Sequence, residues 1–297
     1  MTSDDHPSSR PTSGLTSRPT GQVYRDVVAR LRNTDITTAE LDARLLLSAA
    51  TGVDDVSLIA DPDRFLDPKK LALLEALVAQ RIAGKPVSRL LGVREFWGLD
   101  FSLNAETLDP RPDSETLIEA VLGKIPDKSA ALKMLDLGTG TGCLLLALLS
   151  EFPNAVGTGV DCSEIAVEAA TKNADRLGLG TRSTFQVGDW ARGLDGAFDV
   201  IVSNPPYIPT GDLIGLSVEV REHDPAKALD GGTDGLDAYR RILPEMRRLL
   251  TSVGYGFLEF GEGQSADIAS IAENAGLEAL EIRADLSSVL RVLTVKR

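Results

Sequence analysis

The feature that most constrains the fold of this chain is a glycine-rich segment that lies between an apolar stretch and a helix pattern. Residues 134–142 are Met-Leu-Asp-Leu-Gly-Thr-Gly-Thr-Gly, and an apolar run begins at Cys143. Glycine lets the backbone turn sharply and lets a ligand approach without interference from a Cβ atom, and the first turn of a helix has unpaired N–H groups. Such a segment predicts a strand, a ligand-binding loop and a helix in succession.

Apolar strand patterns alternate with helix patterns from Leu132 onward. This alternation is typical of an α/β fold with a doubly wound, mostly parallel sheet. The last two strand patterns are separated by only a short turn, so we expect the final strand to run antiparallel to its neighbour. The seven expected strands are Leu132–Leu137, Ala155–Val160, Ser183–Val187, Phe198–Ser203, Gly254–Phe260, Leu277–Ile282 and Val289–Val295.

The chain before this sheet changes in composition along its length. Residues 1–20 are rich in Ser, Thr, Pro and Asp and have almost nothing to bury, which predicts a disordered tail. Residues 21–88 have a helical pattern throughout, which predicts a helical domain. Two of its helix starts are marked by a capping-box sequence at Thr37–Glu40 and by an N-cap signal at Asp67-Pro68.

A hairpin and linker are expected over residues 89–112, since Glu95–Phe101 alternates apolar and polar residues around a glycine. The sheet domain is then expected over residues 113–297.

Charge and cysteine usage exclude several classes of function. Lys and Arg number 31 against 44 Asp and Glu, a net charge of −13, which disfavours direct nucleic-acid binding because that needs Lys and Arg against phosphates. Two histidines and no metal-ligand spacing predict no metal site. Cys143 and Cys162 are expected to be buried free thiols. The longest apolar run is too short for a membrane, and the N-terminus has no signal-peptide core, so we expect a cytoplasmic protein. We also expect it to be a monomer.

The glycine loop departs from the dinucleotide-binding pattern, whose last glycine would fall at Cys143. Gly-x-Gly-x-Gly after an acidic residue instead resembles the first motif of class I methyltransferases. Asp136 suits a cofactor such as S-adenosylmethionine, which carries a sulfonium cation and an amino acid group. Asp161 ends the next strand, where a carboxylate can accept both ribose hydroxyls. Asp161 and Glu164 also fit a capping box, so a helix-capping role stays open.

The strongest chemical signal is Asn204-Pro205-Pro206-Tyr207, at the end of the fourth expected strand. In an open α/β sheet this position faces the same cleft as the glycine loop. The Asn204 side-chain oxygen and the Pro205 carbonyl can both accept hydrogen bonds from one –NH2 group, and Tyr207 offers a flat face to a planar group. An amide nitrogen is a poor nucleophile, and two acceptors on its hydrogens favour a pyramidal nitrogen aimed at a methyl carbon. A rigid structural Pro-Pro turn is the alternative.

From about Val23 to its end the chain resembles the bacterial peptide-chain release factor glutamine methyltransferases. The segments that carry the resemblance occur in the family's order, and together they are far more specific than any one of them. They are Glu95–Leu99, Pro110–Glu115, Val202–Ile208, Ala228–Leu236, Tyr239–Ile242 and Leu258–Gly261.

This resemblance implies a fold, a cofactor and a substrate. The fold is a class I methyltransferase sheet with an N-terminal helical domain over residues 21–88 that recognises the substrate. The cofactor is S-adenosylmethionine, and the partners are class I release factors, methylated at the glutamine of their Gly-Gly-Gln motif. The implied cofactor contacts are Asp136, Gly138, Thr139, Gly140, Thr141, Gly142, Asp161, Asp189, Trp190 and Asn204, with Trp190 near the adenine. The implied substrate contacts are Asn204, Pro205, Pro206, Tyr207, Arg111 and Glu115, of which Asn204, Pro205 and Tyr207 are catalytic.

Some positions depart from the family pattern, and some alternatives stay open. Asp109 stands where an apolar residue is expected, Ser114 replaces threonine, and Asp285–Ser288 lacks an expected glycine. For Arg111 and Glu115, a structural salt bridge at a helix start is the alternative. A sister family methylates a glutamine of a ribosomal protein. Asn-Pro-Pro-Tyr alone also occurs in enzymes that methylate adenine in DNA or RNA, and a non-catalytic binding module is a third possibility.

Overall fold

The computed structural model describes residues 17–34 and 36–297, so most of the tail predicted over residues 1–20 lies outside the described residues. The chain divides into two compact units, residues 1–91 and 92–297. The first described helix, α1, begins at Thr20, inside the range assigned to the tail, and Ser17 donates a hydrogen bond to the Leu66 carbonyl at 2.7 Å.

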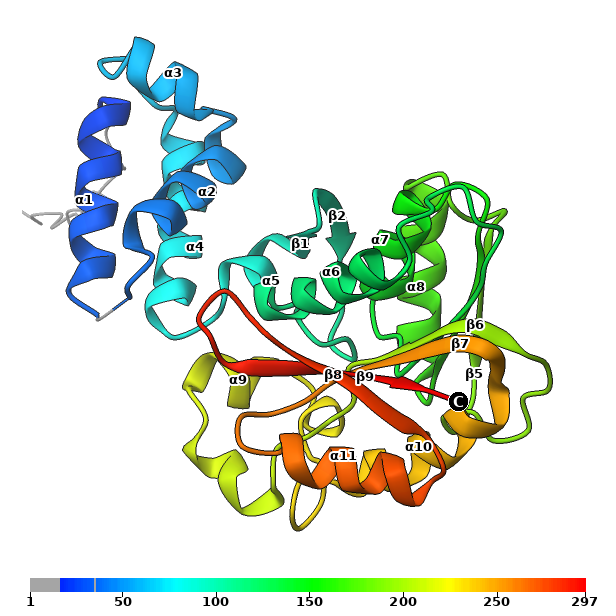
Figure 1. The fold of residues 1–297 in the computed structure, drawn as a ribbon. Coiled ribbons are helices and arrows are strands. Elements are labelled where there is room, and N and C mark those ends of the chain that lie inside the picture. Colours follow the sequence, from blue (N-terminus) through cyan, green and yellow to red (C-terminus); the bar gives the residue numbers. More distant parts are fainter. Residues whose placement is uncertain (1–16, 35) are drawn as a thin grey trace, which may run out of the picture. The chain divides into compact units, whose positions relative to one another are not determined.

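The smaller unit is helical (Figure 1). Its helices are α1 (Thr20–Arg32), α2 (Ala39–Thr51), α3 (Asp55–Ala60), α4 (Pro68–Ile82) and α5 (Val87–Leu91). Aliphatic side chains spaced at helical intervals form its core, among them Val27, Leu31, Leu46, Leu74 and Val78.

Two helix starts in this unit test the sequence predictions, and the unit also contains a buried ion pair. Asp67 accepts a hydrogen bond from Lys69 N at 2.7 Å, with proline at the first helical position of α4, as predicted. The predicted capping box at Thr37–Glu40 is wrong, because the N-cap of α2 is Thr38 and its side chain makes no capping bond. Asp42 and Arg81, both almost fully buried, pair at 2.6 Å. A buried charge needs such a partner because it has lost its water.

The larger unit contains a hairpin and a seven-stranded sheet. The hairpin pairs β1 (Val93–Phe96) with β2 (Leu99–Ser102), as predicted. The sheet order is β5-β4-β3-β6-β7-β9-β8, and β9 runs antiparallel to both its neighbours, which confirms the predicted doubly wound, mostly parallel fold. The strands are β3 (Lys133–Leu137), β4 (Val156–Asp161), β5 (Ser183–Val187), β6 (Phe198–Ser203), β7 (Leu250–Glu259), β8 (Glu278–Ala284) and β9 (Leu290–Lys296).

Helices cover both faces of this sheet, with α6, α7 and α8 on one side and α10 and α11 on the other (Figure 1). The described helical segments are η1 (Pro112–Ser114), α6 (Glu115–Lys124), α7 (Cys143–Glu151), α8 (Glu164–Arg176), η2 (Thr210–Gly215), α9 (Val218–His223), η3 (Ala226–Ala228), α10 (Asp237–Leu249) and α11 (Ser265–Asn274).

Successive residues of the central strands pack into two separate hydrophobic cores, because side chains along a strand point alternately to the two faces of the sheet. Met134, Val200 and Val202 pack with α6, α7 and α8. Leu135 and Ile201 pack on the opposite face with α10 and α11. The central strands are therefore apolar on both faces, as parallel strands between helix layers must be.

In the turn between β8 and β9, where the family pattern has a glycine, Ser288 takes the conformation that a glycine would adopt. Ser288 has φ +65°, the left-handed conformation that glycine adopts without strain. Asp285 holds the turn by accepting hydrogen bonds from Ser287 N at 2.8 Å and Val289 N at 3.0 Å.

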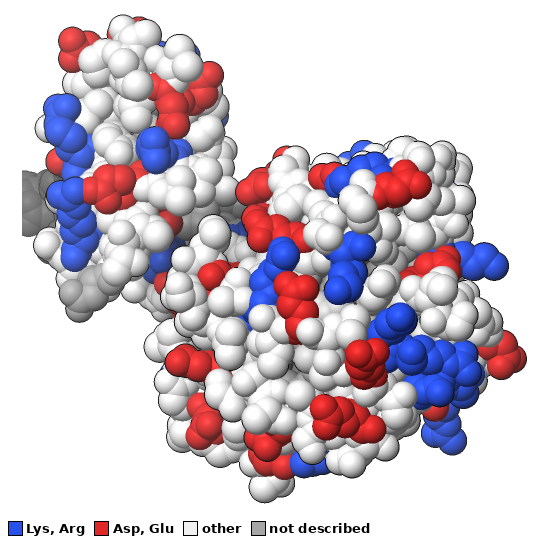
Figure 2. Space-filling view, in the orientation of Figure 1, with Lys and Arg blue, Asp and Glu red and all other residues white. Residues whose placement is uncertain are grey.

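Acidic and basic side chains are both spread over the face of each unit shown in Figure 2, and basic ones gather beside the C-terminal end of the larger unit. The net charge of −13 therefore does not make this face uniformly acidic. Within the described residues, no helix is both long enough and apolar enough to cross a membrane.

Candidate active site

The glycine loop and the Asn-Pro-Pro-Tyr segment are neighbours because β3 and β6 are adjacent parallel strands. Asp136 is level with Val202, so both strands end at the same height. The Ser203 hydroxyl donates to the Leu137 carbonyl at 2.6 Å and ties the two ends together. The sheet order reverses beside β3, and a ligand site is expected at such a point.

The three loop glycines all have positive φ, at +78° for Gly138, +54° for Gly140 and +80° for Gly142. A Cβ at Gly138 would lie 3.2 Å from the Trp190 ring, and one at Gly142 would lie 3.2 Å from the Ala170 and Leu146 side chains. A Cβ at Gly140 would meet nothing within 4 Å. The loop is thus packed at both ends and open in the middle, which makes a cradle.

Asp161 at the end of β4 holds the middle of this cradle. Its Oδ2 accepts a hydrogen bond from Gly140 N at 2.9 Å, and its Oδ1 accepts one from Ser163 N at 2.9 Å. The N-cap of α8 is Ser163, whose hydroxyl accepts from Ala166 N, so Asp161 does not form the capping box that was the alternative. Each carboxylate oxygen keeps a second lone pair for a ligand hydroxyl.

Asp136 lies beneath the loop and does not itself line the cavity. Its side chain is fully buried, and its Oδ2 accepts from the Thr139 hydroxyl at 2.6 Å. Its Oδ1 has no hydrogen-bond partner among the described residues. Burial, and to a lesser degree the nearby Asp161, raise the pKa of Asp136 to about 7. A buried, half-satisfied carboxylate stabilises a cation close to the loop.

Asp189 and Trp190 also line the cavity, together with Arg241. Arg241 pairs with the Asp189 carboxylate. Trp190 has φ +53°, an uncommon conformation for a bulky residue, and such strain occurs preferentially at functional sites. Its ring faces Gly138, where it offers a flat surface for a planar base.

The Asn-Pro-Pro-Tyr segment is split between the cavity wall and its support. Asn204 and Pro206 line the cavity. Pro205 is buried, and the half-buried Tyr207 packs on the core beside α10. Asn204 Nδ2 donates to the Ser114 hydroxyl at 3.1 Å. Ser114, which stands where the family pattern has threonine, therefore contacts this segment directly.

Three residues that support this segment were not identified from the sequence. Gln264 Nε2 donates to the Tyr207 carbonyl at 2.9 Å, and its Oε1 accepts from Gly261 N at 2.9 Å. Gly235 packs directly against the same carbonyl. Glu259 is buried beside Asn204 and Ser114. The only signal for them in the sequence is their place in the segments around Ala228–Leu236 and Leu258–Gly261.

Arg111 and Glu115, the two remaining predicted residues, make different contacts. Arg111 lines the cavity and pairs with the buried Asp224 carboxylate at 2.5 Å. Glu115 does not line the cavity, and its Oε1 accepts from Trp97 N at 2.9 Å in the hairpin turn. The contacts of Glu115 are those of a structural residue.

The unexpected Asp109, just before this segment, is buried and lies 3.7 Å from the Arg94 guanidinium. The positive charge of Arg94 thus lies near Asp109, the acidic residue that stands where an apolar one was expected.

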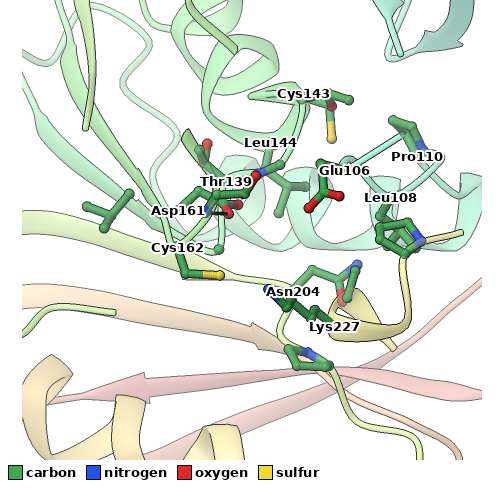
Figure 3. Close-up of a pocket in the computed structure, with 18 of the residues that line it drawn as sticks. Glu106, Leu108, Pro110, Thr139, Cys143, Leu144, Asp161, Cys162, Asn204 and Lys227 are labelled. Carbon is green, nitrogen blue, oxygen red and sulfur yellow. Dashed lines mark hydrogen bonds between the residues drawn. The ribbon is translucent and has the colours of Figure 1, made fainter. Parts of the chain in front are cut away.

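Those of these residues that line the cavity surround a volume of about 540 Å³, within the range for a small-molecule cofactor (Figure 3). Glu106, Leu108, Cys162 and Lys227 also contribute to the wall and were not predicted. The prediction that Cys162 is buried is wrong, because it is exposed, while Cys143 is partly buried. The buried Thr141 hydroxyl on the cavity wall has no partner among the described residues and fits the polar end of an amino acid cofactor.

The sheet order, the glycine cradle and the acidic residues at the ends of β3 and β4 define a class I S-adenosylmethionine-dependent methyltransferase. A model of the methyltransferase domain matches residues 128–274, and a model of the PrmC N-terminal domain matches residues 22–92. The hMettl16 catalytic domain in complex with MAT2A 3'UTR hairpin 6 shares the fold, with a TM-score of 0.55 at 17% identity over 74% of this chain and 81% of that one.

Two curated relatives are release factor glutamine methyltransferases. The one from Rhodospirillum rubrum is 46% identical over 90% of this chain and 82% of its own length, and the one from Bradyrhizobium diazoefficiens is 43% identical over 97% and 98%. The chain belongs to the release factor glutamine methyltransferase family.

Proposed function

We propose that this enzyme transfers a methyl group from S-adenosylmethionine to the side-chain amide nitrogen of the glutamine in the Gly-Gly-Gln motif of class I peptide-chain release factors. The observation that carries this proposal is the position of Asn204 on the wall of the cofactor cavity, one strand away from the glycine loop. The function named for its relatives supports the same substrate. Release factors act on ribosomes, so the proposed place of action is the cytoplasm.

The residues of the cavity divide the work of holding the cofactor. The Gly138–Gly142 loop cradles its amino acid portion, Asp161 accepts the ribose hydroxyls, and Trp190 covers the base. Asp136 balances positive charge from below the loop. When bound, S-adenosylmethionine supplies a methyl group on a sulfonium, which makes the methyl carbon electrophilic and gives a neutral thioether as the leaving group.

The Asn-Pro-Pro-Tyr segment positions the acceptor nitrogen. Asn204 Oδ1 and the Pro205 carbonyl accept the two amide hydrogens of the substrate glutamine, which draws the nitrogen out of conjugation. Both acceptors also stabilise the positive charge that develops on this nitrogen, which is lost when one of the two amide hydrogens leaves as a proton to solvent. Most of the rate then comes from position, since a nitrogen held next to the methyl group needs no encounter step.

The test is a transfer assay with methyl-labelled S-adenosylmethionine. Label is expected on a class I release factor and not on its variant with Gln→Ala in the Gly-Gly-Gln motif. A ribosomal large-subunit fraction and adenine-containing DNA and RNA serve as parallel substrates. Label on a ribosomal protein or on nucleic acid, with none on the release factor, would contradict the proposed substrate.

Cofactor affinity is expected to rise with pH because of Asp136. The pKa of its buried carboxyl is raised to about 7 in the free enzyme, so below pH 7 it carries a proton. A cationic ligand favours the ionised form, so binding must release that proton, which costs more as the pH falls. The Kd for S-adenosylmethionine should therefore decrease roughly tenfold between pH 6 and 7.5.

Calorimetry in buffers of different ionisation enthalpy measures both the Kd and the released proton. Asp136→Asn is expected to bind more weakly at pH 7.5 and to lose the pH dependence. A wild-type Kd that does not change over this pH range would show that Asp136 does not sense the cofactor.

A further inference from the structure

The end of β7 places a carboxylic acid, Glu259, directly behind the Asn-Pro-Pro-Tyr segment. β7 pairs with β6 in parallel, with Leu258 level with Ser203. The Glu259 residue is 2% exposed, and it is not among the residues that line the cavity. The Ser114 and Asn204 side chains are its hydrogen-bonding neighbours. A carboxyl group in this position has no access to substrate or solvent, so any effect it has must pass through these two neighbours.

Asn204 must present its oxygen, not its nitrogen, to the substrate. The Asn204 amide is planar, and its Oδ1 and Nδ2 are nearly the same size, so packing alone does not choose between the two orientations. Only hydrogen bonds choose. If the amide flipped, its –NH2 would face the –NH2 of the substrate glutamine, and two donors would oppose each other.

The hydrogen bonds behind Asn204 select one orientation. Nδ2 donates to the Ser114 hydroxyl at 3.1 Å, which leaves the hydroxyl proton of Ser114 free to be donated onward. Ionised Glu259 is purely an acceptor, and it lies beside Ser114 and Asn204 with its buried Oε2 unpartnered among the described residues, so it can accept from the Ser114 hydroxyl or from the Asn204 –NH2. Ser114 and Glu259 both favour the Nδ2 side of the Asn204 amide, so Oδ1 points away from these two residues.

We propose that Glu259 is a positioning residue, which fixes the Asn204 amide through Ser114 so that Oδ1 faces the substrate nitrogen. This inference rests on the proposed function, since it assumes an –NH2 acceptor at Asn204. It deepens that function by assigning the orientation of Asn204 to a residue that does not touch the substrate.

Glu259 can fix the orientation of the Asn204 amide only when it is ionised, because a protonated carboxyl is also a donor and tolerates the flipped amide. Burial raises the pKa of Glu259 to about 7, while hydrogen bonding to Ser114 and Asn204 and the charge of Arg291 oppose the rise. The other titratable groups around it are Asp113, Tyr207, Tyr239 and Cys143. Arg291 itself pairs with Asp285 at 3.1 Å and with Asp113 at 3.7 Å.

The experiment compares Glu259→Gln with wild type in release factor methylation at saturating S-adenosylmethionine, which keeps Asp136 ionised. Glu259→Gln keeps the shape but replaces one acceptor with a donor. We expect its kcat at pH 8 to fall roughly tenfold, the loss of one hydrogen bond's worth of transition-state stabilisation, with the Kd for S-adenosylmethionine within twofold of wild type. Wild-type kcat should fall below pH 7, and the kcat of Glu259→Gln should not change with pH.

Glu262→Gln is the matched control, because Glu262 is an exposed glutamate three residues further along the chain. It is expected to retain the wild-type kcat and pH profile. A double-mutant cycle with Ser114→Ala adds a second measurement. If both residues act through one amide, the double variant should be hardly worse than the more damaging single variant.

The outcomes separate the inference from the proposed function. Wild-type enzyme that does not methylate the release factor contradicts the function. Active wild-type enzyme, together with wild-type kcat and pH profile in Glu259→Gln, or additive effects with Ser114→Ala, contradicts the role of Glu259. Should Glu259→Gln fail to fold, Glu259→Asp takes its place. This variant keeps a carboxylate and should keep the pH dependence, and a flat profile in it would overturn the inference.

Discussion

Replacing Asn204 with alanine is expected to lower kcat for release factor methylation by about 10²–10³-fold, the effect typical of removing one preorganised group that stabilises transition-state charge. The variant loses the side-chain acceptor on the cavity wall, and the Pro205 carbonyl alone no longer holds both hydrogens of the substrate amide. The glycine loop, Asp161 and Trp190 are unchanged, so the Kd for S-adenosylmethionine should weaken by no more than about tenfold. Single-turnover kinetics and calorimetry measure the two quantities separately.

Asn154→Ala is a suitable control for this variant. Asn154 is exposed, and its side chain donates a hydrogen bond to the Ser129 carbonyl at 2.9 Å in a surface loop of the same unit. It should leave kcat and cofactor affinity unchanged. If Asn204→Ala retained more than about a tenth of wild-type kcat, Asn204 would not be the group that positions the acceptor nitrogen.

Gly235→Ala is expected to be nearly as damaging, although Gly235 does not line the cavity. Its φ of +76° is strained for alanine by about 1–2 kcal/mol. An added Cβ would also lie 2.6 Å from Gln264 Nε2 and closer still to the Tyr207 carbonyl oxygen. The Tyr207 carbonyl must then move and carry the Asn-Pro-Pro-Tyr segment with it. A displacement of about 1 Å is sufficient for a 100-fold loss in kcat.

Gly211→Ala is the matched control, since a Cβ at this position in η2 would meet nothing within 4 Å. The free energy of unfolding, measured in urea, should fall by at least about 1 kcal/mol in Gly235→Ala and stay unchanged in Gly211→Ala. Wild-type activity in a destabilised Gly235→Ala would mean that the segment tolerates movement of Tyr207.

The sequence alone predicted the sheet well, and it predicted that the glycine loop and Asp161 stand at strand ends, for physical reasons. Strands buried on both faces appear as apolar runs, and Leu132–Leu137 and Phe198–Ser203 differ from β3 and β6 by at most one residue. The glycine loop and Asp161 each follow directly on such a run. Once these strands are adjacent and parallel, the glycine loop and Asp161 necessarily lie close to each other.

The support of the acceptor segment could not be predicted in the same way. Glu259, Gln264 and Gly235 come from three different elements, and nothing in their local sequence marks them as neighbours of Asn204. The same holds for Glu115, whose bond to Trp97 N depends on how the hairpin packs. A side chain that acts through tertiary contacts leaves little periodic or compositional trace.

The position of the cavity within the chain has a consequence for how such enzymes diversify. Every described residue that lines it lies between Glu106 and Arg241, so the described lining belongs to the larger unit alone. The sequence of the first 91 residues can therefore vary among such enzymes without changing any described residue of this lining. We expect the residues that hold the methyl donor to vary less between lineages than the residues of the smaller unit.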